Sequence, residues 1–228
     1  MSEKIQSAVA RLNSILPLHA QQKNLSREGA SLYQQLLTSF VEKGRMLMPQ
    51  EIATLTSDVS AVVAELKKTS LIVWDGNNNP VGIYPFTMEQ RVHSIMVNGF
   101  AIHAMCALDA LAVSAVSGLP VVIDSRCDVT KTPLHIDQKG CQLLNVQELQ
   151  EVFFAINWNA ASSSCCCADS LCTEMIFIRG VAAANKWQAQ DNSNRELFTL
   201  EEAVKFATGF FKPLWPNHLT LQSHVNSA

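Results

Sequence analysis

The sequence predicts an α+β fold in two parts: a winged-helix-like domain of three helices over residues 1–87, then a mixed α/β domain with short strands over residues 88–228. Two observations predict this division. Apolar residues at helical spacing fill residues 1–70 and give way to a hairpin signal. Beyond residue 88, short apolar runs alternate with helical segments. A chain of 228 residues can bury a core without disulfide bonds.

The helices of the first part are marked at their ends by capping residues and prolines. Pro17 ends the first helix and Pro49 opens a short one. Ser26 and Ser57 are candidate N-caps, and Gly44 is a candidate C-cap. The predicted helical segments are 5–16, 26–44, 49–55 and 57–68.

A hairpin signal follows, because the short apolar runs 71–74 and 81–84 flank a turn rich in Asn, Gly and Pro. Three helices and a hairpin follow the winged-helix order, which raises the question of DNA binding. Residues 1–90 contain eight Lys or Arg and eight Asp or Glu, so the module has no net charge. Neutralisation of phosphates supplies most non-specific DNA affinity. We therefore expect a packing or lid module and no nucleic-acid partner.

The second part is predicted to mix strands and helices. Asn98 and Gly99 are expected to form a turn into an apolar helix that starts at Phe100. A capping box at Thr199 to Glu202 predicts a helix that runs to about residue 211. The predicted strands are 92–97, 121–125, 133–136, 153–157 and 175–178.

Charge and cysteine content narrow the classes of function. The net charge of −3 suggests neither a nucleic-acid footprint nor an anionic-membrane surface. The N-terminus has no apolar core of a secretory signal, so a cytoplasmic location with reduced thiols is expected. The long apolar stretch 100–123 contains His, Asp, Gly and Pro, so no membrane span is predicted. Seven clustered cysteines in a reducing compartment indicate metal binding or catalysis.

Cys106 and Asp109 form the first candidate site. On a helix, residues three apart share a face, with Cβ atoms about 5–6 Å apart. The surrounding segment is apolar almost all round, so this face should be buried. A buried carboxylate without partners is costly or becomes protonated. Either Asp109 pairs with a neighbour and Cys106 is a small core residue, or the pair binds a soft electrophile and passes protons.

A second group of thiols comprises Cys165, Cys166, Cys167 and Cys172, four cysteines in eight residues. Their spacing is not that of a zinc ribbon. Alternatively, instead of forming part of a functional site, the triplet Cys165–Cys167 would be an exposed loop that scavenges metal ions. Cys172 directly precedes the apolar strand 175–178, which is a rigid place for a functional thiol.

The other candidates carry weaker signals. Cys127 is interpreted as a buried thiol that stabilises a turn, and Cys141 as an ordinary core thiol. His135 alternates with apolar residues on a predicted strand and is expected to be a satisfied polar side chain. The sequence has no glycine-rich phosphate loop, no serine nucleophile elbow and no paired metal-ligand histidines.

The segment 97–111, with its Cys-Ala-Leu-Asp tetrapeptide at 106–109, resembles the core of the alkylmercury lyase (organomercurial lyase) family. The likeness continues through 125–133, Leu171–Cys172, the Trp187 region and the helix 199–211, and the helical front end also looks like the N-terminal domain of that family. His103 and Met105 stand where the family leads us to expect aromatic residues, and Thr173 stands where some members have another cysteine.

The resemblance implies that residues 88–228 form a catalytic domain that cleaves a carbon–mercury bond. It implies Cys106 and Cys172 as the mercury-binding thiols and Asp109 as the proton relay and a further mercury contact. Cys127 matches a cysteine regarded as structural. An alternative alignment places the second catalytic thiol at Cys167, but Cys172 keeps the following strand in register.

The implied reaction converts an organomercurial into a hydrocarbon and Hg(II), since mercury is soft and prefers thiolate ligands. No organic cofactor is expected. Small thiols, or hand-over to a mercuric reductase, would be needed for release of Hg(II).

Three other functions remain open at this point. A soft-metal sensor or scavenger for mercury, copper or zinc would use the same cysteines without needing Asp109 as a relay. A winged-helix regulator with a thiol effector domain would require DNA binding. A thiol redox enzyme would require a Cys-x-x-Cys-type motif, which the sequence lacks.

Overall fold

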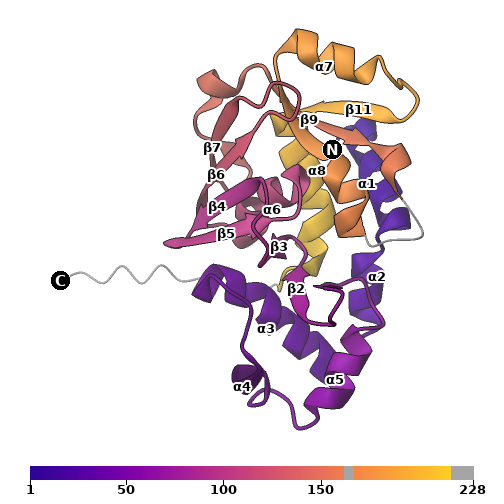
Figure 1. Cartoon of the computed structure of the whole chain (residues 1–228), viewed down its shortest axis with the longest axis vertical. Helices are drawn as coiled ribbons and strands as arrows, with labels where there is room; N and C mark the ends of the chain where they lie inside the picture. The colour runs from indigo at the N-terminus through magenta and orange to yellow at the C-terminus, as the bar shows by residue number, and fades with distance from the viewer. Residues whose placement is uncertain (162–166, 217–228) are drawn as a thin grey trace, which may run out of the picture.

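The structure is a computed structural model that describes residues 1–161 and 167–216. Two antiparallel sheets pack around a pair of helices, α6 (Ala107–Ser117) and α8 (Leu200–Phe211) (Figure 1). The larger sheet contacts α6, and the smaller sheet contacts both helices. The helices α3, α4 and α5 lie together at the bottom of Figure 1, beneath this core. The predicted α+β class is confirmed at the level of mixed helices and strands.

Five helices precede the first strand, and their caps follow from the sequence. Ser26 accepts a backbone N–H in the first turn of its helix, and Gly44 ends that helix with φ 67°, where glycine has no steric cost. Asp58, not the predicted Ser57, caps the last of the five by accepting the N–H of Ala61 at 2.9 Å. The helices are α1 (Glu3–Ile15), α2 (Leu18–Lys23), α3 (Arg27–Lys43), α4 (Pro49–Ile52) and α5 (Val59–Leu66).

The predicted hairpin is confirmed, and it belongs to the larger sheet. Its strands pair Ile72 with Ile83, and β3 joins them to β5 through a pairing of Phe86 with Ala104. The strand order is β1-β2-β3-β5-β4-β6-β7-β8. The winged-helix assignment and the boundary after residue 87 stay predictions. The strands are β1 (Ile72–Trp74), β2 (Pro80–Ile83), β3 (Phe86–Thr87), β4 (His93–Val97), β5 (Phe100–Ala104), β6 (Pro120–Arg126), β7 (Pro133–Lys139) and β8 (Gln142–Leu143).

The prediction that a helix starts at Phe100 was wrong. Residues 100–104 form β5, which pairs with β4 so that Val97 opposes Phe100. The reason is the Asn98–Gly99 turn: both residues have positive φ, 50° and 82°. Such a two-residue turn matches the twist of a β-hairpin, and Asn-Gly is its strongest sequence signal. The helix begins only at Ala107, so Cys106 lies at its N-terminus.

The smaller sheet has the order β10-β9-β11 and confirms the predicted strands at 153–157 and 175–178. Phe154, Phe198 and Phe206 form an aromatic cluster between this sheet and α8. The predicted capping box of α8 is present, with Thr199 and Glu202 bonding reciprocally. The remaining elements are β9 (Val152–Asn157), β10 (Met175–Arg179), β11 (Arg195–Thr199) and α7 (Val181–Gln188), which lies at the top of Figure 1.

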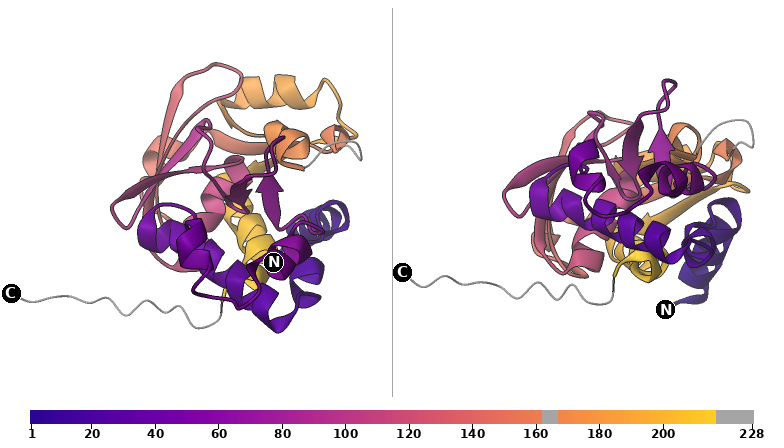
Figure 2. Two further views of the ribbon diagram at one scale, coloured as in Figure 1. Left: turned by 60° about the horizontal axis from the view of Figure 1, so that its bottom comes forward. Right: turned by 90° about the horizontal axis from the view of Figure 1, so that it is seen from below.

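Helix α6 is the buried centre of the fold. It packs against β4, β5, β6, β7, β10 and α8, and most of its residues are inaccessible to solvent. Figure 2 shows the same core from below, with the N-terminal helices in front. The helix has eleven residues, and none of the helices in the described parts of the chain is long and apolar enough to cross a membrane.

Candidate functional site: a buried cluster of two thiols and a carboxyl group

Cys106 is the N-cap of α6. Its backbone is extended, with φ −149° and ψ 177°, and its Sγ accepts the backbone N–H of Asp109 at 3.4 Å. N-caps are usually Ser, Thr, Asp or Asn, whose oxygen fills this role. The expectation that Cys106 and Asp109 share a helix face is therefore corrected, since only Asp109 is within the helix. The capping geometry still brings the two side chains together.

Cys172 reaches the same place from a distant part of the sequence. It lies in the 3₁₀ turn η4 (Leu171–Glu174), directly before β10. One ligand atom each from Cys106, Asp109 and Cys172 lie within 4.8 Å of one another. The three residues are 2%, 1% and 4% exposed. Among the described residues, these three side chains form the one group of His, Cys, Asp or Glu that is arranged to hold a metal ion.

Burial and the contact between the two sulfur atoms together keep both thiols protonated. It raises the pKa of Cys106 to about 12, although a hydrogen bond from Cys172 acts in the opposite direction. A helix N-terminus normally lowers the pKa of a thiol. Because the pKa of Cys106 is raised, desolvation outweighs the effect of the helix here. The hydrogen bond to Cys106 is the largest cause of the raised pKa of Cys172, which lies well above its usual value. Both groups are therefore thiols at neutral pH.

The carboxyl group of Asp109 is also displaced from its ordinary state. Burial raises the pKa of Asp109 from 3.8 to about 7. Its Oδ2 atom is buried and has no hydrogen-bond partner among the described residues. An unpaired buried carboxylate is costly, so the protonated form is favoured. Asp109 can thus exchange a proton near neutral pH, as general acid–base catalysis requires.

A cavity of about 170 Å³ adjoins the cluster at Cys172. Burial lowers the pKa of His93 in its wall to about 4, so this ring is neutral. Arg91 and Arg126 supply positive charge, and Arg91 also pairs with Asp169 at 3.5 Å. The wall consists of Arg91, Val92, His93, Met105, Arg126, Asp128, Cys172, Thr173, Met175, Ile176 and Phe177.

Two methionines to which the sequence analysis gave no role in the site, Met105 and Met175, lie beside it. The Sδ atom of Met175 is 3.6 Å from Sγ of Cys106, and Met105 lies in the cavity wall. Met105 packs so closely on the N-terminal hairpin that a Cβ atom at Gly82 would lie 2.5 Å from its Cε. One sequence signal could have identified Met105: it directly precedes Cys106, and its thioether sulfur is a soft ligand of the kind that mercury prefers.

Cys167 also belongs to this neighbourhood. Its Sγ lies 3.7 Å from Sγ of Cys172, and the side chain is half-buried, whereas Cys106 and Cys172 are buried. The hydrogen bond with Cys172 and burial both raise the pKa of Cys167 above its usual value. Cys167 does not line the cavity. Cys165 and Cys166, and the loop predicted around them, lie outside the described residues.

Cys127 has the surroundings of a structural thiol, as predicted. It is fully buried in the turn after β6, and its Sγ accepts the backbone N–H groups of Thr130 at 3.3 Å and Arg179 at 3.2 Å. Burial by itself would raise the pKa of Cys127, but hydrogen bonds from Thr130 and Arg179 outweigh it and hold the pKa below its usual value. Its contacts join the β6–β7 turn to strand β10.

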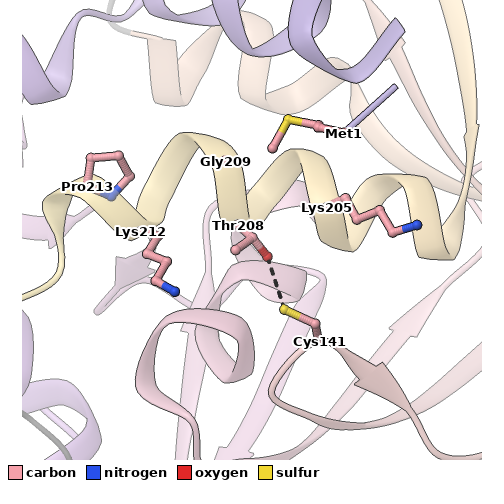
Figure 3. A pocket seen from close by; sticks show the side chains of 7 residues that line it. All are labelled: Met1, Cys141, Lys205, Thr208, Gly209, Lys212 and Pro213. Atoms are coloured by element: carbon pink, nitrogen blue, oxygen red, sulfur yellow. Dashed lines mark hydrogen bonds between the residues drawn. The ribbon is translucent and has the colours of Figure 1, made fainter. Parts of the chain in front are cut away.

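The prediction that Cys141 is a core thiol was wrong. Cys141 is exposed and lines a separate cavity of about 620 Å³ beside α8, together with Lys205, Thr208 and Lys212 (Figure 3). Its Sγ lies 3.6 Å from Oγ1 of Thr208. This cavity shares no lining residue with the one at Cys172. His135 has the polar partner expected of it, because its Nδ1 lies 2.7 Å from Asp124.

Comparisons with known proteins agree on the family of this chain. A family model of the alkylmercury lyases matches residues 86–212. The chain belongs to the alkylmercury lyase family. Alkylmercury lyases of Bacillus cereus and Clostridium butyricum are 27% identical over 209 residues, which cover 90% of this chain and 90% of each relative. The alkylmercury lyase of Streptomyces lividans is 24% identical over 66% of this chain and 69% of its own.

A solved structure supports the same fold. The crystal structure of the mercury-bound form of MerB2 superposes with a TM-score of 0.69, covers 90% of this chain and 99% of that chain, and is 22% identical. The resemblance found in the sequence is confirmed, and the chain is an enzyme of the alkylmercury lyase type. An organomercurial substrate is consistent with this family.

Proposed function

We propose that this protein cleaves the carbon–mercury bond of organomercurials by protonolysis, with Cys106 and Cys172 as mercury ligands and Asp109 as the proton relay. The observation that carries the proposal is the convergence of these three groups, within 4.8 Å, in a buried site. Two soft thiolates suit mercury, and a carboxyl group of raised pKa suits proton transfer to carbon.

The first step is capture of the substrate. An organomercurial arrives as a complex with a small thiol, and its organic group occupies the cavity at Cys172. A cavity of about 150 Å³ is enough to hold benzene, so the cavity of about 170 Å³ accommodates a phenyl group. One cysteine sulfur replaces the small thiolate on mercury and transfers its proton to it. The small thiol then leaves.

The second step is cleavage. The other cysteine binds mercury through its sulfur and gives its proton to Asp109, which passes it to the carbon as the carbon–mercury bond breaks. Electron density from two thiolates weakens that bond. The organomercurial thiolate complex and two cysteine thiols thus become one hydrocarbon, one free small thiol and Hg(II) bound to two thiolates. No electron transfer is needed, and no organic cofactor enters the balance.

The product Hg(II) is proposed to leave to small thiols or to a mercuric reductase. We propose that the reaction takes place in the cytoplasm, because small thiols keep cysteines reduced there. The five cysteines of the described residues are all free thiols, as such a setting requires. We also propose that the protein has no nucleic-acid partner, as its charge predicts.

Replacement of Cys172 by Ser tests the proposal most directly. We expect C172S to stop the release of benzene from phenylmercury in the presence of excess thiol, because the second soft ligand is lost. Gas chromatography of the headspace measures the product. Unchanged turnover would remove Cys172 from the mechanism and favour Cys167 as the second thiol.

A non-catalytic mercury scavenger would use the same thiols, so Asp109 separates the two functions. Loss of a proton relay typically lowers the rate by about 10² to 10⁴. We expect D109N to lose turnover by this factor while it still binds as many equivalents of Hg(II) as the wild type does. Equal loss of turnover and Hg(II) binding would show that Asp109 acts as a ligand alone.

A further inference from the structure

We propose that Cys167 is the exit ligand for the product: Hg(II) moves from the buried Cys106–Cys172 pair to a Cys172–Cys167 pair before an external thiol removes it. The inference rests on the proposed function and concerns a residue to which that function gives no role. Three features of the described residues carry it.

The first feature is geometry. Cys167 and Cys172 lie on consecutive 3₁₀ turns, η3 (Cys167–Asp169) and η4, and their sulfur atoms are 3.7 Å apart. The turns are joined by backbone hydrogen bonds from Ser170 to Cys167 and from Thr173 to Ser170. Arg91 pairs with Asp169 of η3 and also lines the cavity at Cys172. Both sulfurs are therefore held where one mercury ion can contact them in turn.

The second feature is the order of exposure. Cys106 and Cys172 are 2% and 4% exposed, whereas Cys167 is half-buried. An external thiol therefore meets Cys167 first. A mercury ion bound by Cys106 and Cys172 alone has both of its sulfur ligands below the surface.

The third feature is that Cys167 does not line the cavity of about 170 Å³ that is next to Cys172. That space fits a phenyl-sized group, but it is too small for a peptide thiol such as glutathione. The organic group thus uses the cavity, and Hg(II) leaves past Cys167.

The exchange balances without an oxidant or a reductant. The Cys167 thiol attacks Hg(II) and forms a sulfur–mercury bond, and the bond from mercury to Cys106 breaks. The proton of Cys167 passes to the Cys106 thiolate. An external thiol then replaces Cys167 in the same manner, and a second one replaces Cys172. Each step exchanges one thiolate ligand and one proton.

The experiment loads the protein directly with one equivalent of mercuric chloride, which bypasses the cleavage step. Excess glutathione is added, and protein-bound mercury is followed by rapid desalting and atomic absorption. The parent protein carries C165S and C166S, so that neighbouring thiols do not replace the one being tested. C167S and C167A are compared with C141S, which removes an exposed thiol from a cavity with no residue in common with the site.

We expect both Cys167 variants to release Hg(II) about tenfold more slowly than the parent, or slower still, while C141S releases it at the parental rate. A single-turnover burst of benzene from phenylmercury should keep its parental rate in C167S. Circular dichroism verifies that C167S and C167A are folded, and the Ala variant serves if the Ser variant is not. Release rates within threefold of the parent would overturn the inference.

Loss of the benzene burst in C167S would also overturn it, because Cys167 would then be a bond-cleaving thiol. Failure of the proposed function has a different result: the parent itself would release no benzene. The mercuric chloride measurement still tests Cys167 in that case, so the two failures are distinguishable.

Discussion

Strand β10 has the buried cysteines Cys106 and Cys172 near its start and the buried Cys127 near its end, and the two places differ in what surrounds the sulfur. At the start of the strand, Sγ of Cys106 has the sulfur atoms of Met175 and Cys172 beside it and accepts one backbone N–H. Towards its end, Sγ of Cys127 accepts two backbone N–H groups. The first thiol has a raised pKa and the second a lowered one.

The difference shows that burial alone does not define a functional thiol. Cys127 has polar donors directed at its sulfur, so it acts as a fixed acceptor that joins a turn to a strand. The cluster at Cys106 gathers groups that cannot all ionise together, and Asp109 has an unpaired buried oxygen. A soft metal ion, which displaces the protons of both thiols, would relieve this arrangement. The predictions below test this contrast.

The largest expected effect is the pH dependence of stability at Asp109. Its pKa is about 7 in the folded protein and 3.8 in its ordinary state. The folded state thus binds the extra proton between these values, and the free energy of unfolding falls as pH rises through them. D109N has no titrating carboxyl group at this position and so lacks this pH dependence. The difference in free energy of unfolding between D109N and wild type should therefore shift in favour of D109N by on the order of 4 kcal/mol from acidic pH to pH 8.

Urea denaturation of both proteins across this pH range measures the effect. C141S, whose side chain lines a cavity that shares no residue with the cavity at Cys172, is the control and should follow the wild-type curve. Parallel curves for D109N and wild type would show that the Asp109 carboxyl group is not displaced from its ordinary pKa.

A smaller effect is expected at Cys127. C127A leaves the backbone N–H groups of Thr130 and Arg179, which are part-buried, without their acceptor. The net contribution of one hydrogen bond to stability is about 0.5–1.5 kcal/mol, so we expect the loss of two in C127A to lower the free energy of unfolding by about 1–2 kcal/mol. The benzene burst per folded molecule should be retained.

Chemical denaturation and single-turnover kinetics on the same sample test this prediction. C106A is the matched variant, because its sulfur accepts a single N–H. It should lose cleavage with a smaller loss of stability. If C127A kept its stability and lost cleavage instead, the contrast between the two groups of cysteines would be reversed.

The smallest effect is expected at Cys141. Its side chain is exposed, and substitutions at such surface positions usually change stability by less than about 0.5 kcal/mol. C141S should therefore match wild type in thermal denaturation and in turnover. A marked loss of turnover would mean that the cavity beside α8 takes part in the reaction.

The sequence predicted much of the fold correctly where local signals are strong. The Ser26 and Gly44 caps, the hairpin before residue 84 and the capping box at Thr199 are all present. The signal at Asn98–Gly99 was present but was misinterpreted as the start of a helix. The turn requires positive φ at both residues, which produces a hairpin and moves the helix start to Ala107.

The sequence by itself determined the chemistry of the site: thiols at 106 and 172, a carboxyl group at 109, and their resemblance to the alkylmercury lyases. Local patterns carry that information because residue type fixes which metals and protons a group can bind. Only the tertiary structure decided that residues separated by 66 positions converge. Convergence, the burial that protonates Asp109, and the different neighbours of Cys127, Cys141 and Cys167 come from packing between distant strands and helices. No local pattern along the chain encodes such packing.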